Sequence, residues 1–405
     1  MSEWVSHKLS DLMEIIGGGT PKTNVASYWN GDIPWLSVVD FNSGLKHVRN
    51  TEKQISQEGL ENSSTKMLNK RDIIISARGT VGAMAMLETP MTFNQSCYGL
   101  RFKYPLNSQD YLFYLVKNSI NELMQISHGG VFDTITKATF DEVTVNVPED
   151  ETEQHAIAEV LSSLDDKIDL LHRNNKTLEE MAETLFRQWF DMSETSKLKL
   201  GHIGDFFEET IGGEWGKETL NEEFSVEAIC IRGTDIGNLI DGIPSPPTRY
   251  LSDKKFQKCK VLHGDIIIEI SGGTEDQSTG RARYFDTKTI EMLGGSVVFS
   301  NFCRLLRPIN KEIYPYLYLL LRFLYDRGDF FNLENGTSGI KNLALKPFLN
   351  DELYPIPDIE TAIKFSQQVL PLLNKTGYNR IQINNLSKLR DTLLPKLMSG
   401  QVVVH

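Results

Sequence analysis

The chain has 405 residues, of which 40% are hydrophobic and 24% charged, with a formal net charge of −12 at pH 7. These values exclude a wholly disordered or collagen-like chain, and the length allows two or three domains. There is no apolar run of the roughly 20 residues that a membrane span needs. The amino terminus lacks a signal-peptide pattern, and the four cysteines form no paired motif. We therefore expect a cytoplasmic protein without a membrane partner, a disulfide framework or a zinc site.

The first 150 residues have the pattern of an α+β domain. Glycine-rich turns at residues 17–19 and 30–32 punctuate short apolar segments, and the run at 72–76 predicts a buried strand. A helix is expected over residues 109–124. Trp29 and Trp35 are expected to pack within the domain, and Cys97 is expected in its core.

A long helix follows over residues 151–192. From Ile157 onward, apolar residues recur in alternating steps of four and three, which is the heptad pattern of a coiled coil. The carboxylate pairs at 165–166 and 179–180 are expected to lie on its solvated face. The candidate residues for helix pairing and subunit docking are Leu164, Ile168, Leu171, Asn175, Leu178, Leu185 and Trp189.

The second half repeats the first at an offset of about 200 residues. Segments 15–18, 72–76, 93–97 and 147–149 recur in the same order at 210–213, 265–269, 299–303 and 356–358. Four ordered matches predict a second α+β domain over 193–357, with Cys303 in its core, and a second helix over 358–405. The candidate pairing residues of this helix are Leu372, Ile383, Leu386, Leu393 and Leu397.

The two helices are expected to pair with each other as an antiparallel coiled coil that separates two pseudo-repeated α+β domains. Residues 151–195 hold 4 Lys or Arg against 11 Asp or Glu, whereas residues 358–405 hold 6 against 3. Opposite charge on two heptad helices favours their association over self-pairing.

The sequence holds none of the common catalytic signatures that we sought. It has no Walker A motif, no G-x-S-x-G, no H-E-x-x-H and no [ND]-P-P-[YF] tetrapeptide of amino-methylating enzymes, and its eight histidines do not cluster. We therefore expect a non-catalytic binding protein without a metal or cofactor of its own, and disfavour a self-contained methyltransferase or nuclease.

Three features resemble the DNA-specificity subunits of type I restriction–modification systems. Residues 18–21 (GGTP) and 28–35 (YWNGDIPW) resemble the opening pattern of that family. Pro148, Gln154, Ile157 and Leu161 resemble the start of its conserved helix, and the alternation of domain and helix matches its architecture over nearly the whole chain. The second half departs from the pattern at 212–215 (GGEW), at 231–236 and at its helix start, as expected if the two domains read different half-sites.

The resemblance implies a subunit that reads a bipartite, asymmetric double-stranded DNA target, with one half-site for each target-recognition domain. The helices would set the gap and dock two adenine methyltransferase subunits, and restriction (translocase–nuclease) subunits would join for cleavage. S-adenosylmethionine, ATP and Mg²⁺ would be bound by these partners, in a bacterial or archaeal cytoplasm.

Glycine-rich polar loops supply the candidate DNA contacts, because base edges are read by polar side chains that reach a groove. The candidates are Thr20, Arg78, Thr80, His128, Thr136, Lys137, Arg232, Thr274, Gln277, Arg281, Thr337, Ser338 and Lys341. Arg283 lies on the same predicted loop as Arg281. The alternative is a coiled-coil scaffold with two α+β interaction domains and no DNA role, which the net negative charge favours.

Overall fold

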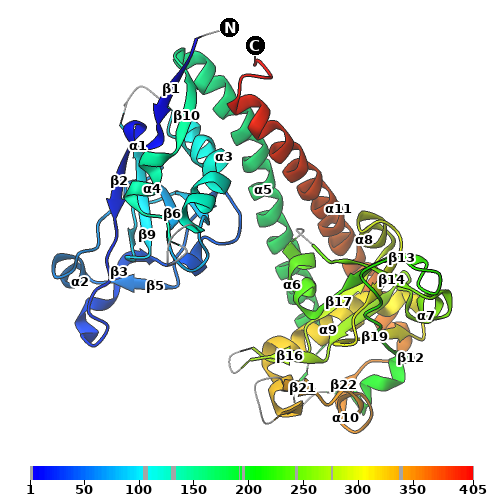
Figure 1. Cartoon of the computed structure of the whole chain (residues 1–405). Coiled ribbons are helices and arrows are strands. Elements are labelled where there is room, and N and C mark those ends of the chain that lie inside the picture. Colours follow the sequence, from blue (N-terminus) through cyan, green and yellow to red (C-terminus); the bar gives the residue numbers. More distant parts are fainter. Residues whose placement is uncertain are drawn as a thin grey trace. The chain divides into compact units, whose positions relative to one another are not determined.

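The computed structural model describes residues 3–103, 108–128, 134–190, 192–193, 197–241, 245–274, 277–336 and 341–404. The chain forms two compact units: Met1–Leu170 with Asn385–His405, and Leu171–Asn384. Each unit holds one α+β part and segments of both long helices (Figure 1). We call residues 3–150 head 1 and residues 193–357 head 2. The compact units therefore divide both long helices, whereas the domain limits predicted from the sequence follow the ends of the helices.

Head 1 is built on two sheets and a terminal strand pair. The larger sheet has the order β2 (Met13–Gly17), β9 (Cys97–Phe102), β6 (Ile73–Ser76), β7 (Met84–Leu87), β4 (His47–Val48). The smaller has the order β5 (Lys53–Ile55), β3 (Trp29–Leu36), β8 (Thr92–Phe93), and β1 (Trp4–Lys8) pairs with β10 (Thr144–Pro148). The helices are α1 (Leu9–Leu12), α2 (Gln57–Glu61), α3 (Gln109–His128) and α4 (Lys137–Glu142).

Head 2 repeats this frame. Its larger sheet has the order β12 (Phe207–Gly212), β19 (Cys303–Pro308), β15 (Asp265–Glu269), β17 (Ala282–Phe285), and its smaller has the order β14 (Thr248–Leu251), β13 (Val226–Ile231), β18 (Val297–Phe299). Strand β11 (Lys199–Gly201) pairs with β22 (Tyr354–Ile356). A further sheet has the order β16 (Ser271–Gly273), β21 (Lys341–Leu343), β20 (Glu334–Asn335). The helices are α6 (Gly233–Asp241), α7 (Asp253–Cys259), α8 (Thr287–Met292), α9 (Tyr314–Arg327) and α10 (Leu345–Asn350).

The predicted repeat is confirmed at the level of single side chains. Arg101 Nε donates to Asp72 Oδ1 at 2.9 Å, and in head 2 Arg307 Nε donates to Asp265 Oδ1 at 3.0 Å. Both aspartates are nearly fully buried and stand next to or at the start of a wholly buried strand. A buried carboxylate requires hydrogen-bonding partners. Each head supplies them from an arginine at the equivalent position. These hydrogen bonds, the largest cause, raise the pKa of both guanidiniums.

The second glycine of the pair that opens each repeat, Gly18 or Gly213, is required by a close crossing of two backbone segments. A Cβ atom on Gly18 would lie 2.2 Å from the carbonyl oxygen of Asn94, and one on Gly213 would lie 2.0 Å from that of Ser300. No other residue type fits at either position without moving the backbone. The second glycine of each pair is therefore a packing feature of the frame, whereas a Cβ atom on Gly17 would meet nothing within 4 Å.

The long helices are α5 (Glu151–Trp189) and α11 (Ile359–Met398), and they pack antiparallel within each unit (Figure 1). In the first unit Leu161 shares a core with Leu394 and Leu397. In the second, the rings of Phe186 and Phe365 lie 5.9 Å apart. Higher residue numbers on α5 thus meet lower numbers on α11, as predicted. No helix in the described part of the chain is long and apolar enough to cross a membrane.

The buried face of α5 departs from the predicted seam in the second unit. Glu179 and Phe186 are buried there, as is Phe190 directly after the end of the helix. The three predicted pairing residues that follow Asn175 on α5 are half-buried or, for the last, 40% exposed: Leu178, Leu185 and Trp189. A straight helix drifts from the 3.5-residue heptad repeat toward 3.6, so its buried face rotates along its length. Head 2 also packs on this segment, which buries a second face that the heptad pattern does not describe.

The other predicted pairing residues are either buried or half-buried. Those that are buried are Ile168, Leu171, Asn175, Ile383 and Leu397. Those that are half-buried are Leu164, Leu372, Leu386 and Leu393.

Candidate functional site

In head 1 the structure brings two predicted loops together. The backbone N–H of Ile135 donates to the carbonyl oxygen of Ala77 at 3.1 Å, which joins the loop after β6 to the segment before α4. The candidate residues on these two loops are all exposed: Arg78, Thr80, Thr136 and Lys137. The Thr136 hydroxyl also caps α4, because it accepts from the backbone N–H of Thr139 at 3.2 Å.

The remaining candidate of head 1 with a described side chain, Thr20, is half-buried and hydrogen-bonded to the side chain of Gln95. Next to it, Trp35 Nε1 donates to the carbonyl oxygen of Gly19 at 3.1 Å. The rings of Trp29 and Trp35 meet edge to face, with centroids 5.2 Å apart. The predicted packing role of the two tryptophans is thus confirmed, and Cys97 and Cys303 are buried as expected.

Head 2 joins the equivalent pair of loops by the equivalent bond. The backbone N–H of Leu343 donates to the carbonyl oxygen of Ile270 at 2.9 Å. Here the contact extends into the sheet of β16, β21 and β20. Thr274 and Gln277 are exposed at its edge and close a turn, since Thr274 N donates to Gln277 O at 2.7 Å.

That additional sheet presents a row of polar side chains. Asn342 of β21 is paired with Asn335 of β20 on one side and with Ser271 of β16 on the other. Both asparagines are exposed, and the next residue on β21, Leu343, is buried. Side-chain amides at such positions can form two hydrogen bonds to an adenine edge. Neither asparagine was predicted as a contact residue, because the loop pattern does not show that these residues align across strands.

Several basic candidates are already paired with carboxylates. Arg281 forms two hydrogen bonds of 2.9 Å to Glu269, and Arg232 forms two of 2.8 Å to Asp235. These bonds, the largest cause, raise the pKa of each guanidinium. Lys341, the third, lies 3.2 Å from a carboxylate oxygen of Glu334. The pairing reduces the positive charge that these side chains can offer to a phosphate.

One expectation for the same region is wrong. Arg283 lies on strand β17, where it is 1% exposed, and its guanidinium stacks 4.2 Å from the centroid of the Tyr284 ring. The predicted loop ends earlier than the sequence suggests, so Arg283 cannot contact DNA without unfolding the strand. Thr337 and Ser338 lie outside the described residues, and His128 ends α3 with a side chain that is also outside them.

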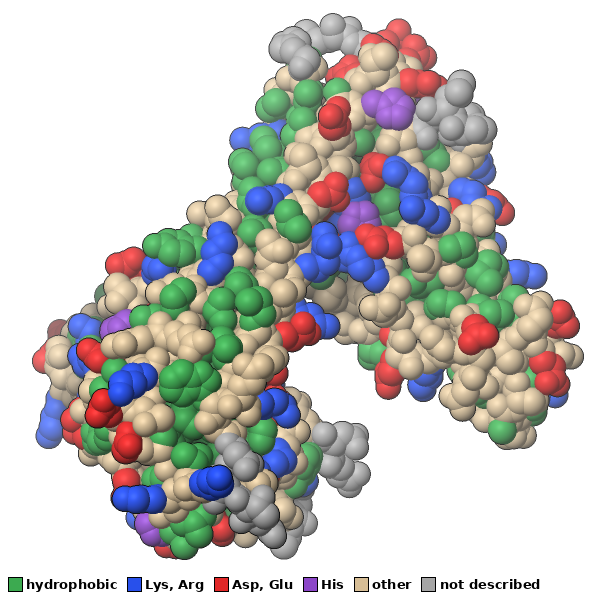
Figure 2. Space-filling view, turned by 180° about the vertical axis from the view of Figure 1, so that it is seen from behind, with side chains coloured by type: hydrophobic (Ala, Val, Ile, Leu, Met, Phe, Trp, Pro, Cys, Tyr) green, Lys and Arg blue, Asp and Glu red, His purple; other side chains and the backbone are tan. Residues whose placement is uncertain are grey.

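The visible surface of each unit shows acidic and basic side chains interspersed, without one continuous basic field (Figure 2). This pattern agrees with the net negative charge of the chain. DNA affinity that depended on the chain alone would therefore rest on a few local side chains.

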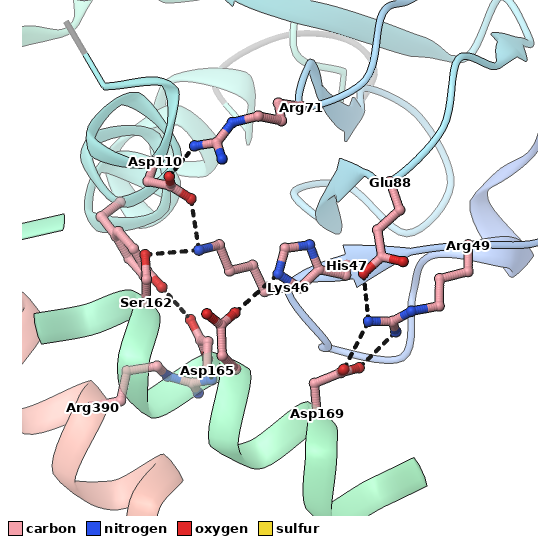
Figure 3. A network of polar contacts seen from close by, with 12 residues as sticks. Lys46, His47, Arg49, Arg71, Glu88, Asp110, Ser162, Asp165, Asp169 and Arg390 are labelled. Carbon is pink, nitrogen blue, oxygen red and sulfur yellow. Dashed lines mark hydrogen bonds and ion pairs between the residues drawn. The ribbon is translucent and has the colours of Figure 1, made fainter. Parts of the chain in front are cut away.

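A network of polar contacts joins head 1 to α5 (Figure 3). Lys46 Nζ, almost fully buried, donates to Ser162 Oγ at 2.8 Å and pairs with Asp110 at 2.7 Å. Arg49 forms two hydrogen bonds to Asp169, at 2.7 and 2.8 Å. Ser162 and Asp169 lie seven residues apart, about two turns, on one face of α5, so head 1 contacts this helix at two points along its length.

The expectation that the carboxylate pairs of α5 are solvated is half wrong. Asp165 is 2% exposed and Glu179 is 9% exposed, whereas the side chains of Asp166 and Glu180 are 59% and 62% exposed. Burial acts to raise the pKa of Asp165, but Lys117 and Arg390 hold it below its ordinary value. The inner member of each pair is thus a buried anion that faces two other helices.

Comparison with known proteins places this arrangement in a family. A family model described as the type I restriction modification DNA specificity domain matches residues 1–180 and 196–385. The chain is 28% identical over 427 aligned residues to the type I restriction enzyme MjaIX specificity subunit of Methanocaldococcus jannaschii, covering 100% of this chain and 94% of that protein. It is 24% identical to the HindI specificity subunit of Haemophilus influenzae, covering 71% and 76%.

A solved structure supports the fold independently. The type I restriction–modification S subunit from M. genitalium aligns with a TM-score of 0.57 and 18% identity, covering 98% of this chain and 96% of that one. The family model matches the chain twice, each match spans one head and part of its following helix, and the two together account for most of the sequence. The chain therefore belongs to the type I restriction–modification DNA specificity family.

Proposed function

We propose that the chain reads a bipartite and asymmetric duplex DNA target, with one half-site for each head. The observation that supports this is the pair of frames, which share the order of four strands in the larger sheet and of three in the smaller but differ in the loops and strands that they expose. Head 1 exposes Arg78 and Lys137, whereas head 2 exposes the amides of Asn335 and Asn342. Two similar frames with different surface chemistry suit two different half-sites, as in dimeric readers whose half-sites are spaced by geometry.

Contacts in head 1 suit phosphates as well as bases. Neither Arg78 nor Lys137 has an ion-pair partner among the described residues, and both are exposed. Free cations of this kind bind the DNA backbone, while threonine hydroxyls and asparagine amides can read base edges. This chemistry favours the DNA-reading interpretation over that of a scaffold without a DNA role.

The paired helices would dock two adenine methyltransferase subunits, and restriction subunits would join them. Their described surface carries exposed apolar side chains that a partner would cover, each 38–55% exposed: Leu170, Met181, Trp189, Tyr378 and Leu389. In this proposal the chain is non-catalytic. S-adenosylmethionine, ATP and Mg²⁺ are bound by the partner subunits.

Selection from a random duplex library tests the proposal. The full chain is co-purified with its methyltransferase and incubated with the library, and bound duplexes are sequenced. We expect two short conserved sequences, different from each other, at one fixed gap. A single uninterrupted motif, or no enrichment by the complex, would contradict the proposed function.

A further inference from the structure

One buried carboxylate joins three helices in the first unit. Asp165 of α5 accepts a hydrogen bond from the Tyr114 hydroxyl of α3 at 2.8 Å and lies 3.8 Å from Lys117 Nζ of the same helix. Its other oxygen accepts from Arg390 Nη1 of α11 at 2.6 Å. The head, the first long helix and the second long helix therefore meet at one side chain (Figure 3).

The second unit contains the same arrangement. Glu179 of α5 accepts from Arg322 Nη1 of α9 at 2.8 Å and from Arg380 Nη2 of α11 at 2.7 Å. Helix α9 is the counterpart of α3, and Arg322 and Lys117 are both the ninth residue of their helices. In each unit a buried anion of α5 thus joins the head to the paired helices through one cation from each neighbouring helix. We call these two clusters the clamps: Asp165 with Lys117 and Arg390, and Glu179 with Arg322 and Arg380.

Stability alone does not account for these clamps. Removing charges from water is costly, and well-packed apolar residues of similar size often stabilise a protein as well as a buried ion pair does. Charge-assisted hydrogen bonds differ from apolar contacts in being directional, because they hold donor and acceptor in one geometry. A clamp that joins three helices at one point therefore limits rotation and sliding of the head on the helices.

We propose that Asp165 and Glu179 are positioning residues that fix the orientation of each head on the paired helices, and thereby the gap between the two half-sites. The inference rests on the proposed function, in which each head reads one half-site. A head that can tilt on its helices reaches half-sites at neighbouring gaps, whereas a clamped head accepts one gap. The clamps orient the heads, so they do not determine which bases a head reads.

The test removes only the contacts between head 1 and Asp165 in the first clamp. The double variant Tyr114→Phe, Lys117→Met leaves Asp165 paired with Arg390, so the buried carboxylate keeps a counter-ion. The matched control is Lys176→Met, a lysine of α5 that is 80% exposed and lies 4.0 Å from Glu180. Each full-length variant is co-purified with the methyltransferase and assayed for methyl transfer on duplexes whose gap differs by one base pair.

We expect the double variant to methylate targets with a gap one base pair longer or shorter about tenfold faster, relative to the original gap, than the wild-type complex does. A factor of this order is typical for the loss of a hydrogen bond to a charged group. The base preference within both half-sites should not change. The control should keep the wild-type preference for one gap.

Three results would overturn the inference. An unchanged gap preference would show that the clamp only stabilises the fold. An altered base preference in a half-site would show that these residues determine which bases the head reads. Loss of methylation at every gap in a complex that still assembles would show a role in activity instead. Failure of the proposed function is distinguishable, because the wild-type complex would then select no bipartite target before any variant is made.

Discussion

The side-chain amide of Asn379 donates a hydrogen bond of 2.8 Å to the Oδ1 atom of Asn175, between two buried residues of α11 and α5. The second carboxamide oxygen of the pair, on Asn379, has no hydrogen-bond partner among the described residues. A buried asparagine in a helical interface fixes register at a cost in stability, because any shift leaves a polar group unpaired. We infer that this pair sets the register of α5 against α11 in the second unit.

The pair predicts a non-additive pattern of stability. Asn175→Leu should lower the free energy of unfolding by about 1–3 kcal/mol, since it leaves the Asn379 amide buried without its partner. Replacing both asparagines by leucine should recover that loss or exceed it, because two apolar residues replace two polar ones. Urea unfolding of the four members of the double-mutant cycle measures this. Additive losses would contradict a direct Asn175–Asn379 interaction.

The asparagine row of head 2 predicts a local change in specificity. Asn342→Ala should weaken discrimination at one base pair of one half-site by about 1–3 kcal/mol, the usual contribution of a good side-chain contact to a base. Library selection with the variant complex measures this as a relaxed position. The other half-site, which head 1 reads in our proposal, is the internal control. Equal loss at both half-sites would mean that the substitution acts on folding or assembly.

Free and paired arginines should behave differently toward salt. Arg78→Ala should weaken binding to all duplexes and reduce the slope of log K against log salt by about one unit, as for the loss of one phosphate contact. Arg281→Met should leave that slope unchanged. It should instead lower stability by about 3 kcal/mol, since Glu269 would remain buried without its counter-ion. Binding titrations at several salt concentrations, with thermal unfolding in parallel, separate the two effects.

Much of the frame could be predicted from the sequence because its signals are local. The isoleucine runs of β6 and β15 are buried strands, and the glycine pairs at 17–18 and 212–213 mark the same close backbone crossing in both heads. The clamps could not be predicted in this way. A heptad pattern describes contact between two helices, whereas Asp165 and Glu179 face a third helix from the head, which depends on tertiary packing.

The loops show the same limit for the candidate site. The sequence identified the two segments of head 2 that meet, yet not that they pair as strands and align Asn335 with Asn342. It also could not show that the counter-ion of Arg281 is Glu269, which ends strand β15. Arg283 was misplaced because a strand of four residues, Ala282–Phe285, follows directly after a glycine-rich stretch.

The packing of head 2 on α5 predicts that an insertion after the helix does not change the gap between half-sites. Head 2 packs on α5 before that helix ends: the ring of Phe186 lies 6.1 Å from that of Tyr316, and Arg322 binds Glu179. Four residues inserted after Phe190 lengthen only the connection that follows these contacts. We therefore expect methylome sequencing to show an unchanged gap. A shifted gap would mean that the connecting segment, and not the packed helices, places the head.

The matching insertion lies between the two units. One heptad added after Leu170 in α5 and one after Asn384 in α11 preserve the register of the pair and lengthen it by about 10.5 Å at 1.5 Å per residue. That length corresponds to about three base pairs, which also rotate a half-site by roughly 100° around the duplex. A heptad in a supercoil rotates its end much less. We expect this variant to lose methylation of the original target while its thermal unfolding is unchanged. Full activity at the original gap would show that the helices do not set the spacing.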